Sequence, residues 1–129
     1  MEKIHVKKGQ LIFQENTPGS DMFVIQSGKV RVFKIINAEK VELAILGKDD
    51  FFGEMCLLLG CPRSASVEAL EHTELYRLTK DTFRSSIKSK PQLAEKMART
   101  LARRLLNANS IIANLEGEKR SLEIIYGLK

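Results

Sequence analysis

The fold of this chain is decided by one stretch, Phe51-Phe52-Gly53-Glu54-Met55-Cys56-Leu57-Leu58-Leu59-Gly60-Cys61-Pro62-Arg63-Ser64-Ala65-Ser66-Val67. This central stretch begins with a turn and continues into an apolar segment that is too short for an ordinary helix. It turns again at Gly60 and Pro62, and then places an arginine at the head of an alternating strand. A carboxylate, Glu54, and a guanidinium, Arg63, therefore flank a single apolar turn.

Short strand-like segments surround the central stretch, with Gly or Pro at many of the turns between them. We expect strands at 4–6, 11–13, 22–25, 30–35 and 41–46, and after the central stretch at 64–70 and 75–78. The segments 22–25 and 30–35 are expected to pair as a hairpin through the turn 26–29. About eight short strands over residues 3–79 favour an antiparallel sandwich, expected to be a double-stranded β-helix or jelly roll.

The character of the sequence changes at Thr79, where helix-forming residues replace strand-forming ones. A short helix is expected over 82–88, followed by a long C-terminal helix from Gln92 to about Glu116. Gly117 is a candidate point of interruption, and 121–129 is expected to be a weak last helical piece or tail. Apolar residues then recur at alternating steps of four and three, at Leu101, Leu105, Ala108, Ile112 and Leu115, and Leu122 continues the series. This heptad seam favours a parallel homodimer, although packing on the chain's own sandwich is an alternative.

The length of 129 residues predicts one domain, 1–129, with a β-sandwich at about 3–79 and a helical hinge or dimerisation segment at about 80–129. No run approaches the ~18 apolar residues of a membrane span. The N-terminal residues lack the apolar region of a secretory signal. We therefore expect a cytoplasmic protein that does not contact membranes.

Metal and nucleic-acid sites are not expected from the composition. Cys56 and Cys61 lie close together in a non-secreted chain, where a disulfide is not expected. Together with His5 and His72, which are distant in sequence, they do not match a zinc-ligand set. The net charge of +5 is spread along the chain and forms no dense basic cluster, so no DNA contact is expected from this chain alone.

The residue types of the central stretch suit a small phosphorylated ligand. Gly53 permits close backbone approach. The first amides of a turn at 54–59 lack helical partners and favour an anion. Arg63 supplies a planar donor fork for phosphate oxygens, and Glu54, an acceptor when ionised, suits a sugar hydroxyl or another cation. These features predict a nucleotide site without a Walker motif. The alternative is that Glu54 and Arg63 form an ordinary surface salt bridge.

The sequence resembles the cyclic nucleotide-binding domains of the catabolite activator protein type, the CRP/FNR-like effector domains. The resemblance rests on Phe52-Gly53-Glu54 and on Arg63-Ser64-Ala65-Ser66-Val67-Glu68-Ala69, which are similar to the family's phosphate-binding cassette, and on Met22–Gly28 ahead of it. It implies that the arginine and nearby amides hold the cyclic phosphate, and that the glutamate holds the ribose 2′-hydroxyl. The ligand-binding residues that it implies are Gly53, Glu54, Met55, Cys56, Arg63, Ser64 and Ala65.

Two positions depart from the family's pattern. The family prefers a very small residue where Cys56 stands, and Cys is expected to narrow the site only slightly. The segment 102–105 resembles the activator's hinge helix, but Ala108-Asn109 stands where that protein presents Thr-Ser to the base. Asn109 or Asn107 is then the candidate to hydrogen-bond the base. The choice between cAMP and cGMP stays open.

The resemblance and the residues together predict a cyclic-nucleotide sensor that couples ligand binding to movement of the C-terminal helix. No nucleophile–base pair, carboxylate pair or metal set suited to chemistry on the ligand stands out, so an enzyme is not expected. One alternative is the effector half of a CRP/FNR-like transcription regulator without its DNA-binding domain. Another is a degenerate dimerisation module that binds no nucleotide.

Overall fold

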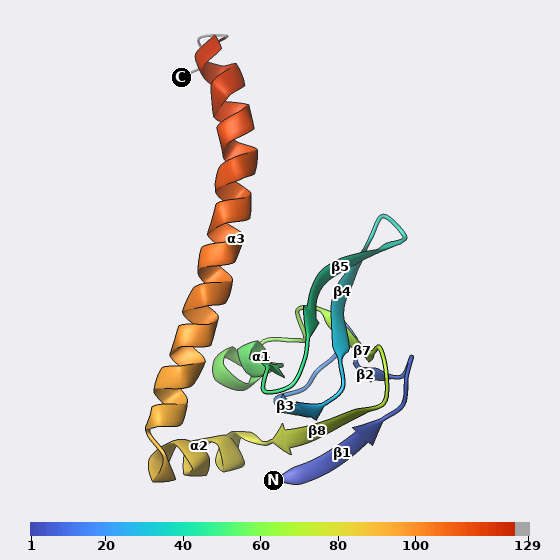
Figure 1. The fold of residues 1–129 in the computed structure, drawn as a ribbon. Coiled ribbons are helices and arrows are strands. Elements are labelled where there is room, and N and C mark those ends of the chain that lie inside the picture. The colour runs from blue at the N-terminus through green and yellow to red at the C-terminus, as the bar shows by residue number, and fades with distance from the viewer. Residues whose placement is uncertain (126–129) are drawn as a thin grey trace. The chain divides into compact units, whose positions relative to one another are not determined.

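The computed structural model describes residues 1–125, and the side chains of residues 1–115. The chain divides into two compact units, Met1–Ser85 and Ser86–Lys129 (Figure 1). The first unit contains eight strands: β1 (Glu2–Val6), β2 (Leu11–Phe13), β3 (Met22–Ser27), β4 (Val30–Ile36), β5 (Glu39–Leu46), β6 (Phe51–Phe52), β7 (Ser66–Ala69) and β8 (Thr73–Leu78). They form two four-stranded sheets, with the orders β1-β8-β3-β6 and β2-β7-β4-β5. Because every pairing is antiparallel, the predicted jelly-roll sandwich is confirmed.

The hairpin predicted between β3 and β4 is wrong, because these strands lie in different sheets. The turn between them carries the chain from one sheet to the other. The Oγ1 atom of Thr73, a fully buried residue, donates a hydrogen bond of 3.2 Å to the main-chain oxygen of Lys29. The main-chain nitrogen of Leu70 donates to the same oxygen at 2.9 Å. The turn is therefore held by Leu70 and by the first residue of β8, which the local pattern of β3 and β4 does not reveal.

The hairpin that does form in this region joins β4 to β5. Ile36 pairs with Glu39 across the two residues Asn37 and Ala38. Both have positive φ angles, 52° and 65°, as a tight turn between twisted strands requires.

The hydrophobic core lies between the two sheets and takes side chains from both. Phe23 and Phe52, on neighbouring strands, stack with ring centroids 5.3 Å apart, and Phe13 packs on both rings. Burying each large apolar side chain contributes about 1.5–3 kcal/mol. The buried cluster consists of Val6, Phe23, Ile25, Val30, Phe52, Val67, Ala69 and Leu75.

Three helices complete the described chain. Helix α1 (Glu54–Leu59) has the predicted bounds, and α2 (Lys80–Ser89) is slightly longer than predicted. Helix α3 (Gln92–Ile125) continues through Gly117, so the predicted interruption there is wrong. A single glycine costs a helix only about 1 kcal/mol, which good helix formers on both sides outweigh. The side chain of Leu122 and the tail residues 126–129 lie outside the described residues. Among residues 1–125, no helix combines the length and apolar character needed to cross a membrane.

Candidate functional site

The central stretch starts from the core of the sandwich. Phe51 and Phe52 form β6, a strand that the pattern did not predict, and both are buried. Gly53 follows with φ 84°, in the left-handed region that favours glycine. A Cβ atom at this position would lie 2.9 Å from both Arg63 Nη1 and the main-chain oxygen of Asp21. Position 53 therefore requires a glycine, both because its φ angle is positive and because Arg63 approaches its backbone closely.

Arg63 is buried, with 5% of its surface exposed. Its Nη1 atom donates hydrogen bonds to the main-chain oxygens of Asp21, at 2.8 Å, and Gly53, at 3.3 Å. The guanidinium carbon lies 4.1 Å from the ring centroid of Phe13, in cation–π geometry. The guanidinium is thus fixed in one place by two carbonyl groups and an aromatic face.

The loop between β2 and β3 clamps Arg63 from the other side. The main-chain nitrogen of Arg63 donates to the oxygen of Thr17 at 3.0 Å, and the nitrogen of Asn16 donates to the oxygen of Arg63 at 2.8 Å. A Cβ atom on Gly19 would lie 2.8 Å from both Nε and Nη2 of Arg63. The Pro18-Gly19 pair of this loop is a visible signal for a turn. The contact of the loop with Arg63 could not be predicted, because the two segments are remote in sequence.

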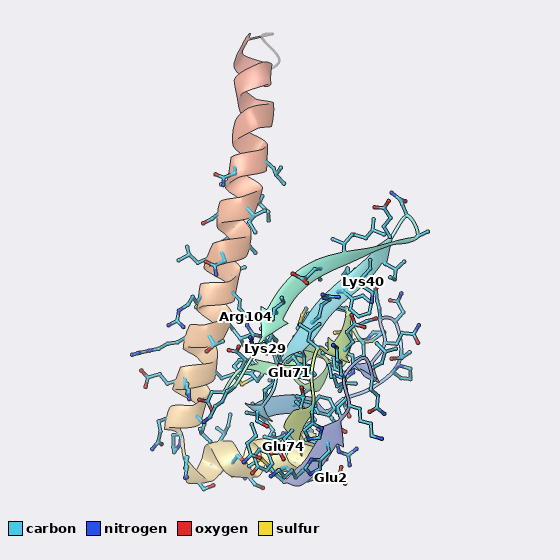
Figure 2. The ribbon with its side chains drawn as sticks, turned by 45° about the vertical axis from the view of Figure 1, so that its right-hand side comes forward. Glu2, Lys29, Lys40, Glu71, Glu74 and Arg104 are labelled. Carbon is cyan, nitrogen blue, oxygen red and sulfur yellow. The ribbon has the colours of Figure 1, made fainter. Side chains whose placement is uncertain are left out.

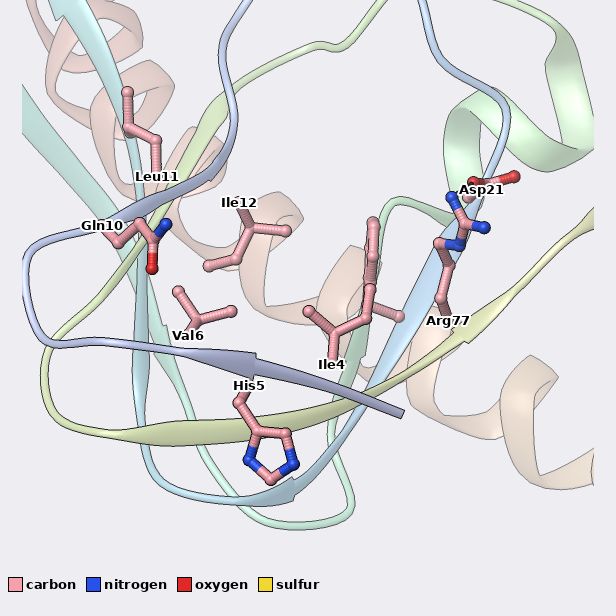
Figure 3. Close-up of a pocket in the computed structure, with 9 residues that line it drawn as sticks. Ile4, His5, Val6, Gln10, Leu11, Ile12, Asp21 and Arg77 are labelled. Carbon is pink, nitrogen blue, oxygen red and sulfur yellow. Dashed lines mark ion pairs between the residues drawn. The ribbon is translucent and has the colours of Figure 1, made fainter. Parts of the chain in front are cut away.

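The charge of Arg63 has no carboxylate partner at ion-pair distance among the side chains of residues 1–115 for which contacts are given. The carboxylate of Asp21 instead pairs with Nη1 of Arg77, at 3.2 Å (Figure 3). Backbone carbonyls orient a guanidinium but do not neutralise it, and a buried charge is costly unless an opposite charge compensates it. The arrangement is therefore suited to accept an anionic group.

Helix α1 carries the other predicted residues of the central stretch. Glu54 is 8% exposed and Cys56 is 2% exposed, whereas Met55 is about half exposed. Glu54 and Arg63 are both buried, so the interpretation of the pair as a surface salt bridge is wrong. Burial raises the pKa of the Cys56 thiol, and the positive charge of Arg63 opposes that rise. Cys56 is therefore a neutral packing group at neutral pH.

The residues after Arg63 lie close to α1. Ser64 is exposed, and its Oγ atom lies 3.7 Å from the sulfur of Met55. Ala65 is buried beside the start of β7. The structure thus brings the predicted residues of the central stretch together around one turn. Asn109 lies on α3 with an exposed side chain, and its part in a site stays a prediction.

The chain matches the family described as "Cyclic nucleotide-binding domain" over residues 3–90. It is 36% identical to the "Cyclic AMP receptor protein" of Thermus thermophilus over 94% of this chain and 56% of that protein. The fold matches a crystal structure of the Thermus thermophilus catabolite activator protein with a TM-score of 0.82 and 35% identity, over 89% of this chain and 55% of that one.

A second solved structure, the EAL enzyme Bd1971 in its cAMP-bound form, matches 98% of this chain and 33% of that one, with 28% identity and a TM-score of 0.64. A cGMP-bound form of the same enzyme matches 81% of this chain and 28% of that one, with 33% identity and a TM-score of 0.63. The chain spans about half the length of two curated relatives that it matches, 56% of one and 52% of the other. The family match covers most of the chain and agrees with the sandwich and the buried arginine. The chain therefore belongs to the cyclic nucleotide-binding domain family, of the catabolite activator protein (CRP/FNR-like) type.

Proposed function

We propose that this chain is a regulatory module that binds a cyclic nucleotide through its central stretch. The observation that carries the proposal is the buried guanidinium of Arg63, which is fixed by backbone carbonyls and has no carboxylate partner among the contacts described for residues 1–115. A cyclic phosphate carries one negative charge shared by two exocyclic oxygens, which can accept a pair of hydrogen bonds from the free edge of a guanidinium. Binding would place a negative charge beside this buried guanidinium.

Glu54 is the proposed ribose ligand. It is the first residue of α1 and directly follows Gly53, whose main-chain oxygen accepts a hydrogen bond from Arg63. An ionised carboxylate only accepts hydrogen bonds, so it suits the 2′-hydroxyl of a ribose and is repelled by phosphate. A carboxylate and a guanidinium on either side of one helical turn thus match the two ends of a nucleoside cyclic phosphate.

The proposed ligand is cAMP or cGMP. Two of the similar proteins support cAMP: the "Cyclic AMP receptor protein" of Thermus thermophilus and the cAMP-bound EAL enzyme. The cGMP-bound form of that same enzyme supports the second nucleotide as well. Asn109 is the proposed base contact, because an amide offers both a donor and an acceptor to a purine edge.

The proposed output is a shift in the position or pairing of α3. A ligand shifts the equilibrium between two positions of a helix only if it binds the two conformations of the protein with different affinity. Leu105, Ile112 and Leu115 of the seam are all more than half exposed, which supports the proposal that a second copy covers them in a homodimer. The proposed module has no catalytic role of its own.

The second candidate function is the effector half of a transcription regulator. It is favoured by the chain's coverage of 56% and 52% of two regulators of this type. Both candidates share the same ligand site, and they differ only in the output to which the site is connected.

Thermal unfolding with added nucleotides tests the proposed function. Ligands that bind only the native state raise its apparent stability, by about 2.7 kcal/mol at a concentration 100 times the Kd. We expect cAMP or cGMP to raise the Tm of the wild type, and 5′-AMP, which lacks the cyclic ester, to raise it far less. The Arg63→Ala variant should lose the shift. An unchanged wild-type Tm with both cyclic nucleotides at millimolar concentration would contradict the proposal.

A further inference from the structure

The two histidines of this chain lie side by side on the surface of the sandwich, although they are far apart in sequence. His5 lies on β1, and Glu74 is its direct partner on β8 in the antiparallel register. His72 lies just before β8, and its ring stacks on that of His5 with centroids 5.8 Å apart and planes inclined by 27°. One nitrogen from each histidine and one oxygen of Glu74 all lie within 4.8 Å of one another.

We propose that His5, His72 and Glu74 form a binding site for a divalent transition-metal ion of the zinc class. Two imidazoles and one carboxylate are a ligand set that zinc accepts, with the remaining coordination position taken by water. The wide separation of His5 and His72 in the sequence does not predict this site. The register between β1 and β8 brings them together, because it pairs His5 with Glu74, two residues after His72.

To coordinate a metal, the three ligand atoms, which lie within 4.8 Å of one another, must move closer together by rotation of their side chains. Zinc–nitrogen bonds of about 2.0–2.1 Å in a tetrahedron place neighbouring ligand atoms about 3.3–3.5 Å apart. The Nδ1 atom of His5 already lies 3.6 Å from Oε1 of Glu74. The other carboxylate oxygen, Oε2, is held by Nζ of Lys3 at 3.3 Å, which leaves Oε1 directed at the histidines. Lys3 therefore orients the carboxylate, in the manner of the outer partners that commonly support metal ligands.

The site is accessible to an ion from solvent. More than half of the His5 side chain is exposed, and His72 is exposed as well. Figure 3 shows the His5 ring on the opposite side of β1 from the side chains of Ile4 and Val6, with which His5 lines a cavity of about 270 Å³. Metal bound by the two histidines and Glu74 would connect β1, an edge strand, to β8 and the turn before it.

This site is separate from the central stretch and does not depend on nucleotide binding. Its ligands come from β1, β8 and the preceding turn, and none of them contacts Arg63 in the hydrogen bonds or ion pairs described. A metal that binds only the native state stabilises it by mass action. Zinc is thus expected to strengthen the attachment of β1 whether or not a nucleotide is bound.

Titration of the chain with ZnCl₂, followed by proton NMR and calorimetry, tests the proposal. Because the chain has only two histidines, their ring resonances are assigned by comparing His5→Gln with His72→Gln. We expect both sets of resonances to change together and to saturate at one equivalent of Zn²⁺, and EDTA to reverse the change. His5→Gln, His72→Gln and Glu74→Gln should each weaken binding by at least about tenfold.

Two variants serve as matched controls. Glu71→Gln removes a neighbouring exposed carboxylate outside the cluster and should leave zinc affinity unchanged; both carboxylates are labelled in Figure 2. Cys61→Ser removes a partly exposed thiol that also has affinity for zinc, and should leave the histidine response intact. Zinc binding that is lost in Cys61→Ser, or histidine resonances that do not respond to Zn²⁺, would overturn the proposal.

Discussion

The Nη1 atom of Arg63 donates a hydrogen bond of 2.8 Å to the main-chain oxygen of Asp21, a residue 42 positions earlier in the chain. This bond joins the central stretch to the loop that precedes β3. The same loop holds the main chain of Arg63 through Thr17, and Gly19 leaves room for the guanidinium. The position of the proposed phosphate ligand is therefore set by the loop as much as by the central stretch.

Gly19→Ala should weaken cyclic-nucleotide binding while the chain stays folded. The added Cβ would lie 2.8 Å from two guanidinium nitrogens, and the flexible end of Arg63 would move to avoid the clash. Displacement of a packed group costs about 1–3 kcal/mol, and we expect a loss of that size in binding free energy by calorimetry. Gly47→Ala is the matched control, since its nearest contact would be at 4.0 Å. Equal losses in the two variants would show that Gly19 has no particular role at the site.

Glu54→Gln should weaken binding of the ribonucleotide more than binding of its 2′-deoxy analogue. The proposed carboxylate–hydroxyl hydrogen bond involves a charged acceptor, for which about 1.5–3 kcal/mol is typical. The 2′-deoxy ligand cannot make this bond in either protein. A double-mutant cycle, in which both the protein and the ligand are varied and binding is measured by calorimetry, isolates the free energy of this hydrogen bond. Equal losses with both ligands would assign Glu54 a structural role.

Cys61 should react with iodoacetamide well before Cys56. The thiolate is the reactive form, and burial raises the pKa of Cys56 while also blocking access to it. Cys61 is partly exposed. Between pH 7 and 9, modification of Cys56 should therefore lag behind that of Cys61, as followed by mass spectrometry of peptides. Modification of both thiols at one rate would contradict the packing of α1 described above.

Leu105→Glu combined with Ile112→Glu should convert the proposed homodimer to a monomer. Both side chains are more than half exposed and lie on the heptad seam, where charges would face each other in a parallel pair. Leu106→Glu with Ile111→Glu offers a matched control, because these residues are equally exposed but lie off the seam. Light scattering distinguishes the outcomes. A monomeric wild type, or monomers from both double variants, would contradict pairing through the seam.

Local sequence signals predicted some parts of this structure well. Gly53 and Gly60 bracket the apolar turn, and α1 has the expected bounds because both ends are encoded by adjacent residues. The regular spacing of short strands and turns correctly predicted the antiparallel jelly roll, and the resemblance to the family singled out Arg63. These features depend on residue patterns within short segments, which can be read directly from one sequence.

Contacts between remote segments could not be predicted in the same way. The β3–β4 pattern suggested a hairpin, because alternation and a turn do not specify which sheet receives the next strand. The contact of Gly19 with Arg63 and the pairing of His5 with Glu74 depend on sandwich topology and strand register. Such relationships follow from the packing of the whole domain.

Isothermal titration of cAMP and cGMP into the wild type, Arg63→Ala and Arg31→Ala is the sharpest test of Arg63 as the phosphate ligand. Arg31 belongs to the same sandwich but pairs with Glu42 and Glu68. We expect at least one nucleotide to bind the wild type, Arg31→Ala to bind it equally well, and Arg63→Ala to lose about 2–4 kcal/mol of binding free energy. Unchanged affinity in a folded Arg63→Ala variant would contradict the assignment of this buried guanidinium as the phosphate ligand.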